Sequence, residues 1–87
     1  MSALSWSRWT DDVVMVLRTL NLEPNKEITL QTVYKFREIL LHLHPQNNHI
    51  DAKIRQQMQV LRNYNFVEFL GDGVYMVIRP LPNRSHL

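Results

Sequence analysis

The nine residues from Lys53 to Leu61, KIRQQMQVL, combine two cations with three glutamines and contain no carboxylate. Glutamine presents a donor and an acceptor at one tip and so matches N6 and N7 of adenine, while arginine matches O6 and N7 of guanine. A carboxylate in the same place would repel phosphate. If these side chains share one face of a helix, their chemistry suits the base edges of double-stranded DNA. A polar helix surface that only meets solvent is the other interpretation.

Helical spacing predicts that these side chains do share a face. With successive residues roughly 100° apart, a helix from about His49 to Tyr64 carries an apolar stripe of Ile50, Ile54, Met58 and Leu61. The opposite face is broad and polar, with small Ala52 in its middle and Lys53 and Arg62 at its edges. The members of this outward face are His49, Ala52, Arg55, Gln56, Gln59 and Asn63.

The elements before this helix are also helical. Thr10 is expected to cap a first helix, with Asp11 and Asp12 near its positive end. A short strand at 27–30 leads into a second helix, which Thr29 should cap and Pro45 should stop at about His44. Asn48 is expected to cap the third helix. The third helix is therefore the second of a closely linked pair.

After the third helix the pattern changes to β-strands. Two β-rich runs flank Gly71-Asp72-Gly73, which is a strong signal for a tight hairpin turn. Helix, short strand, helix, helix and hairpin is the order of a winged helix-turn-helix domain, an α+β fold. In that fold the second helix of the pair enters the major groove.

Contacts to phosphate are expected from the borders of this surface. Lys53 and Arg62 have the reach, and the start of the second helix, at Thr29, Gln31 and Thr32, offers backbone amides. Asn48 and its neighbours offer amides at the start of the third helix. Asp72 at the hairpin tip argues mildly against a wing contact, because a cation would serve better there.

The composition is compatible with this interpretation. The chain has 87 residues, a net charge of +2, 45% hydrophobic residues and no cysteine. These values predict one small domain over residues 9–79, with a flexible lead at 1–8 and a flexible tail at 80–87. No apolar run is long enough to span a membrane, so we expect a soluble, intracellular and cytoplasmic protein, monomeric as an isolated domain.

Catalytic and metal sites are not expected. His42, His44 and His49 surround one turn, but no cysteine or convergent carboxylate completes a metal site. Serines occur only near the two ends of the chain, where fixed catalytic geometry is hard to maintain. We therefore predict a chain that is not an enzyme and needs no cofactor or small-molecule substrate.

The stretch DAKIRQQMQVLRNYNFVEFLGDGVYMV, residues 51–77, resembles the C-terminal winged helix domain of DpnI-like, Dam-replacing restriction endonucleases. WT before the first helix, ITLQTVYKFREIL and HPQNNHIDAKIRQQ resemble earlier blocks of the same family, so the likeness spans Trp9 to about Val77. In that family a separate nuclease domain cuts DNA containing N6-methyladenine in GATC, and the winged helix domain recognises the methylated duplex independently.

The resemblance implies a reader of adenine-methylated duplex DNA in a restriction-modification type of protein. The recognition helix of the family corresponds to KIRQQMQ, which assigns recognition to Arg55, Gln56 and Gln59, with Asn48 and His49 at the helix entrance. The acidic wing tip departs from the family, and no glutamate of this chain begins a Glu-x-Lys pair. A metal-dependent nuclease site is therefore not expected within it.

A preference for a methylated base needs an apolar surface, and burial of one methyl group contributes at most about 0.8 kcal/mol. The candidates are Trp6, Trp9, Ala52 and the stem of Arg55. For Trp9, packing against the first helix is the competing interpretation. The competing function for the whole chain is a winged helix adaptor that binds protein and does not bind DNA.

Overall fold

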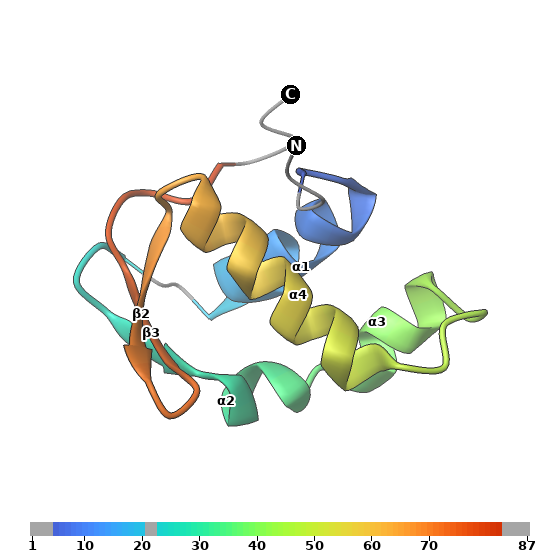
Figure 1. Ribbon diagram of the computed structural model, residues 1–87. Helices are drawn as coiled ribbons and strands as arrows, with labels where there is room; N and C mark the ends of the chain where they lie inside the picture. The colour runs from blue at the N-terminus through green and yellow to red at the C-terminus, as the bar shows by residue number, and fades with distance from the viewer. Residues whose placement is uncertain (1–4, 21–22, 83–87) are drawn as a thin grey trace.

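The computed structural model describes residues 5–20 and 23–82. Its elements, in chain order, are α1 (Arg8–Thr19), β1 (Glu27–Thr29), α2 (Leu30–Tyr34), α3 (Arg37–Leu43), α4 (Ile50–Asn63), β2 (Val67–Gly71) and β3 (Val74–Val77). In Figure 1, α4 crosses the front of the molecule, α1 lies behind it, and the β2–β3 hairpin stands at one end. Helices followed by an antiparallel hairpin confirm the predicted α+β winged helix-turn-helix fold.

The core forms where α1, α4 and the sheet meet. Val13 and Leu17 of α1 are fully buried, as are Ile54, Met58 and Leu61 of α4. The apolar stripe predicted for the third helix is thereby confirmed, apart from Ile50, which is only partly buried. Because this stripe faces α1 and the hairpin, the opposite side of α4 must face outward.

The three strands form one antiparallel sheet in the order β1-β3-β2. Tyr75 of β3 is the central residue of one row, with Ile28 of β1 on one side and Phe69 of β2 on the other. The turn between β2 and β3 has positive φ at Gly71 (98°), Asp72 (51°) and Gly73 (73°). The short strand and the tight hairpin were both predicted, and residues tolerant of positive φ make that turn possible.

The first helix begins earlier than predicted. Ser7, not Thr10, occupies the N-cap, and the helix starts at Arg8. The backbone N–H of Ser7 donates to Oγ1 of Thr10 (3.1 Å), which places Thr10 inside the first turn. The prediction of Thr10 as the N-cap was wrong because its hydroxyl bonds backward, as the third helical residue of a capping box does.

The predicted second helix is two short helices. Lys35 and Phe36 donate to the carbonyls of Thr32 and Val33, three residues back, which closes α2 in a tight turn before α3 begins. Bonds of this type tighten the end of a helix and are poorly suited to its continuation. Figure 1 shows α2 and α3 running in different directions. The expected cap at Thr29 is confirmed, since its Oγ1 accepts from the amide of Thr32 (3.2 Å).

The turn before α4 is built differently from the prediction. His44 ends α3 directly before Pro45, as predicted. The expected capping by Asn48 is wrong, because His49 holds the N-cap position of α4 and Oδ1 of Asn47 accepts from the His49 amide (2.7 Å). The local turn therefore uses the neighbouring asparagine, which can bond the backbone two residues onward.

Packed structure extends past the domain limits expected at residues 9 and 79. Trp6 and Leu81 are both buried, and Arg18 donates to the carbonyl of Leu81 (3.4 Å). The flexibility expected for the lead and the tail falls largely on residues 1–4 and 83–87, which lie outside the described ranges.

Candidate nucleic-acid interface

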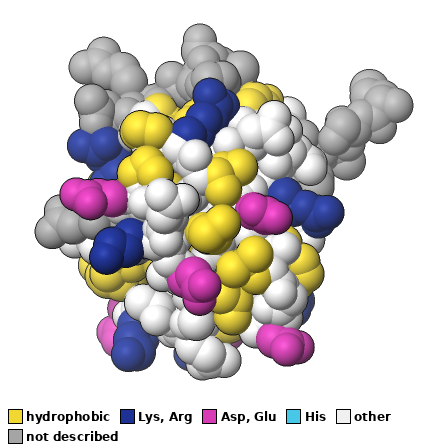
Figure 2. Space-filling view, turned by 90° about the vertical axis from the view of Figure 1, so that its left-hand side faces the viewer, with side chains coloured by type: hydrophobic (Ala, Val, Ile, Leu, Met, Phe, Trp, Pro, Cys, Tyr) yellow, Lys and Arg dark blue, Asp and Glu magenta, His cyan; other side chains and the backbone are white. Residues whose placement is uncertain are grey.

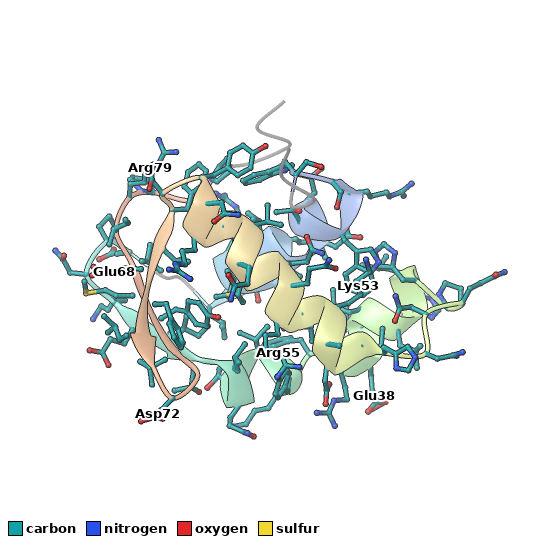
Figure 3. All side chains as sticks on the ribbon, viewed as in Figure 1. Glu38, Lys53, Arg55, Glu68, Asp72 and Arg79 are labelled. Carbon is teal, nitrogen blue, oxygen red and sulfur yellow. The ribbon has the colours of Figure 1, made fainter. Side chains whose placement is uncertain are left out.

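The polar face of α4 points to solvent, as its spacing predicts. Ala52, Arg55, Gln56 and Asn63 are exposed, and Gln59 is partly buried among them. Figure 3 shows Lys53 and Arg55 on opposite edges of α4, with Arg55 on the edge nearest to α2. The helix thus presents amide and small side chains between two borders of positive charge. This is the arrangement that base-edge contact needs, with cations for the phosphates on either side.

A single carboxylate, that of Asp51, lies on α4, and it is paired. Nη2 of Arg37 in α3 lies 2.9 Å from Oδ2 of Asp51, and both side chains are about half exposed. An exposed pair of this kind contributes little to stability, about 0–1 kcal/mol. Its electrostatic effect is local: the arginine offsets the charge of Asp51, while exposed Glu38 of α3 also lies near this end of the helix.

An open hollow of about 540 Å³ lies beside the start of α4. It brings together Asn48, His49 and Ala52, three of the residues predicted from the sequence, and adds Leu41 of α3. Asn48 and His49 are exposed. The hollow therefore has both polar groups and an apolar wall next to the centre of the helix face.

Gln57 is the member of the glutamine run that does not face outward. Its side chain is 3% exposed, and its Oε1 accepts a hydrogen bond of 2.6 Å from Oγ1 of fully buried Thr10. The bond joins α4 to the first turn of α1 and, together with the buried apolar stripe, fixes which side of α4 faces α1. Only Gln56 and Gln59 therefore remain for recognition.

The start of α2 is partly committed to internal bonds. The amide of Leu30 donates to the carbonyl of Gly73 (2.8 Å), and the amide of Thr32 donates to Thr29. Thr29 and Gln31 are exposed, and Thr32 is partly buried. A phosphate contact at this helix start would consequently come from side chains such as Gln31 more readily than from those two amides.

The two tryptophans have different environments, and neither belongs to the outward face of α4. Trp6 is 3% exposed, and its Nε1 donates to Oδ1 of Asp11 (2.7 Å). Trp9 packs against the core and stacks on the ring of His44, with ring centroids 3.9 Å apart. Trp6 is therefore buried away from any DNA methyl group. Trp9 is only partly buried and lines an open hollow with His44 and Asn47, so its contact with a methyl group stays a prediction.

The two acids near the start of α1, Asp11 and Asp12, also have defined partners. Oδ2 of Asp12 lies 2.5 Å from Nε2 of His44. His44 is thus held to α1 twice, by this contact and by its stacking on Trp9, which also belongs to α1. Asp11 bonds Trp6. Both carboxylates, expected only to favour the helix dipole, thus fasten α1 to the segments around it.

Arg79, which charge alone would place among the DNA contacts, closes the far end of α4. It donates to the carbonyls of Tyr64 (2.7 Å) and Asn65 (3.1 Å), and its guanidinium lies 3.9 Å from the ring centroid of Phe66. A cation at the carboxyl end of a helix is favoured by the dipole. Arg84, the other basic residue beyond the hairpin, lies outside the described residues.

The outer face of the hairpin has a different character. Figure 2 shows apolar side chains gathered over it, with carboxylates and several Lys or Arg side chains among and around them. Met76 lies between Glu27 and Glu68 in the sheet register, and Leu70 and Ile78 are exposed. This face combines an apolar centre with charges of both signs and has no positive border like that of α4, so the polar face of α4 is the surface better suited to DNA.

Within residues 5–20 and 23–82 no group of three or more metal-ligating side chains converges. None of the helices in this part of the chain combines the length and the hydropathy that crossing a bilayer requires.

Comparison with known families agrees with this geometry. A family model described as the Dam-replacing HTH domain matches residues 6–77, most of the chain. The chain belongs to this family. Its helix-turn-helix character is that of the DpnI C-terminal domain and implies DNA as the partner. The matched region begins at Trp6, a buried residue, and ends at Val77 with β3.

Proposed function

We propose that this Dam-replacing HTH domain binds double-stranded DNA sequence-specifically, with α4 in the major groove. The observation that carries the proposal is the outward face of α4, where amide and arginine side chains surround Ala52 and the one carboxylate is paired. Gln56, Gln59 and Arg55 contact base edges. Lys53 and Arg62 contact phosphates on the two sides, with Thr29, Gln31 and Thr32 contributing at the start of α2.

We further propose a preference for N6-methyladenine in GATC-like sites, as the reader of a restriction-modification type of protein. The methyl groups meet Ala52 and the stem of Arg55, both exposed on α4, and the hollow at Asn48 and His49 lies beside them. Burial alone would favour each methyl group by at most about 0.8 kcal/mol, less than tenfold. Stronger discrimination requires a polar group that loses its partner when the methyl is absent.

The test is a comparison of unmethylated, hemimethylated and fully methylated GATC duplexes at one stated salt concentration. The proposal expects affinity to rise with each added methyl group. Equal affinity for the three duplexes would remove the methyl preference while leaving duplex binding intact. A scrambled duplex without GATC serves as the control for sequence preference.

One observation favours a second function, protein binding without DNA. The outer face of the hairpin exposes Leu70 and Ile78 among carboxylates, as a protein interface would. Salt dependence separates the two functions. A DNA binder loses affinity along a log-log line with a slope of about −0.9 per phosphate contacted, whereas a protein adaptor has no duplex affinity to lose.

A further inference from the structure

One aromatic side chain of the hairpin is exposed on the side that faces the helices. Phe69 of β2 is 43% exposed, although it lies directly across from Tyr75, which is buried. The two rings are in contact, with centroids 5.1 Å apart. Paired residues of an antiparallel sheet project from the same face. Phe69 therefore projects from the inner face of the sheet, beyond the point where the core ends.

The arginines of α4 lie near the same row of rings. Burial raises the pKa of the Tyr75 hydroxyl, and the positive charges of Arg62 and Arg55 oppose that rise. Both guanidinium groups are therefore within electrostatic reach of Tyr75, whose ring touches Phe69. Arg55 stands on the edge of α4 nearest to α2 in Figure 3. Phe69 and the two arginines consequently belong to neighbouring elements, because α4 packs against β2.

This inner side is the uncharged side of the hairpin. Val67, Phe69, Tyr75 and Val77 alternate with the outward residues of β2 and β3, and none of them carries a charge. Figure 3 shows Asp72 at the tip and Glu68 pointing away from α4. The carboxylate at the tip would repel a DNA duplex lying on α4. On the inner side the duplex would meet the exposed ring of Phe69 and no charged side chain of the strands.

We propose that Phe69 is the contact of the β2–β3 wing with DNA: its exposed ring packs against the base steps of the minor groove next to the major-groove segment occupied by α4. Proteins that bind the minor groove frequently place phenylalanine or another apolar side chain at a base step, and such a contact engages no phosphate. The contact rests on the proposed function, because α4 must first lie on the duplex. It gives this wing a way to bind although its tip is acidic.

The contact is tested by comparing Phe69→Ala with Met76→Ala, an apolar truncation on the opposite face of the same sheet. Full burial of a phenylalanine contributes about 1.5–3 kcal/mol, and less than half of Phe69 remains to be buried. Phe69→Ala should therefore weaken duplex binding about fivefold, or ~1 kcal/mol. The log-log salt slope should stay unchanged, because no phosphate contact is lost. Met76→Ala should bind as the unchanged chain does.

Thermal unfolding of each variant shows whether the change is confined to binding. Should Phe69→Ala fail to fold, Phe69→Trp retains an aromatic ring and reports by fluorescence, with the response of Trp6 and Trp9 subtracted from a titration of the unchanged chain. A blue shift on adding duplex supports the contact. Emission that does not move at saturating duplex, or Phe69→Ala binding equal to the unchanged chain, overturns it. Absence of duplex binding by the unchanged chain would instead refute the proposed function itself.

Discussion

Replacing Gln57 by alanine should destabilise the fold far more than the same change at its neighbour Gln56. The Gln57 amide is buried and accepts from Thr10, so its removal leaves a buried hydroxyl without an acceptor, at a cost of about 1–3 kcal/mol. The one methylene group that is lost, Cγ, adds about 0.8 kcal/mol. Gln57→Ala should therefore lower the free energy of unfolding by about 2–4 kcal/mol.

For a domain of this size, such a loss lowers Tm by roughly 10–30 °C. The measurement is thermal and urea unfolding followed by circular dichroism. Gln56→Ala is the matched control, because Gln56 is exposed and exposed substitutions usually stay within about 0.5 kcal/mol of the parent. Thr10→Val, alone and combined with Gln57→Ala, completes a double-mutant cycle with an expected coupling of about 1 kcal/mol.

Equal stability of the two glutamine variants would refute this reasoning. It would mean that the Thr10–Gln57 bond contributes nothing to the stability of the α1–α4 contact. The placement of α4 would then depend on its buried apolar stripe of Ile54, Met58 and Leu61 alone.

Three further predictions follow from the same structure. Gln56→Ala should relax base preference by about 1–3 kcal/mol at one position, whereas Lys53→Ala should weaken all duplexes equally; a panel of single-base variants distinguishes them. Arg79→Ala should lower the free energy of unfolding by about 1–2 kcal/mol, because the carbonyls of Tyr64 and Asn65 after α4 lose their donor. Duplex affinity, measured by fluorescence anisotropy, should stay unchanged. Burial raises the pKa of the Tyr75 hydroxyl. The neutral hydroxyl therefore stabilises the fold fully below pH ~10, and this stabilisation is lost as pH rises through the folded-state pKa. In unfolding measured against pH, Tyr75→Phe should remove this loss of stability at alkaline pH.

Periodicity was enough to predict the orientation of α4. Ile54, Met58 and Leu61 recur at helical spacing, and burial of that stripe turns Arg55 and Gln56 outward. The hairpin was equally predictable from the sequence, because Gly71-Asp72-Gly73 has the residue types that a tight turn requires. These features depend on local residue types, which a single sequence contains in full.

Other features depend on partners that are distant in the sequence. Gln57 lies three residues after Ile54 and four before Leu61, so its place on the buried stripe was available from spacing. Its acceptor role was not, because Thr10 is 47 residues away in the chain. The burial of Trp6 likewise depends on rings near the end of α4, with Tyr64 and Phe66 both in edge contact.

The division of the second helix was also beyond the sequence pattern. Val33 and Leu40 are both fully buried and continue one apolar stripe, so spacing alone favours one helix through them. The interruption arises because the amides of Lys35 and Phe36 donate to carbonyls three residues earlier, and not four, which ends α2. No proline or glycine marks that position.

The central claim, that the polar face of α4 lies on duplex DNA, is tested most directly by titrating the isotopically labelled chain with a methylated GATC duplex and following backbone amide shifts. The account predicts that the largest changes fall on residues 48–63, with Phe69 among the responders and Glu27 and Met76 unaffected. Changes confined to the outer face of the hairpin, or no change at any duplex concentration, would contradict it.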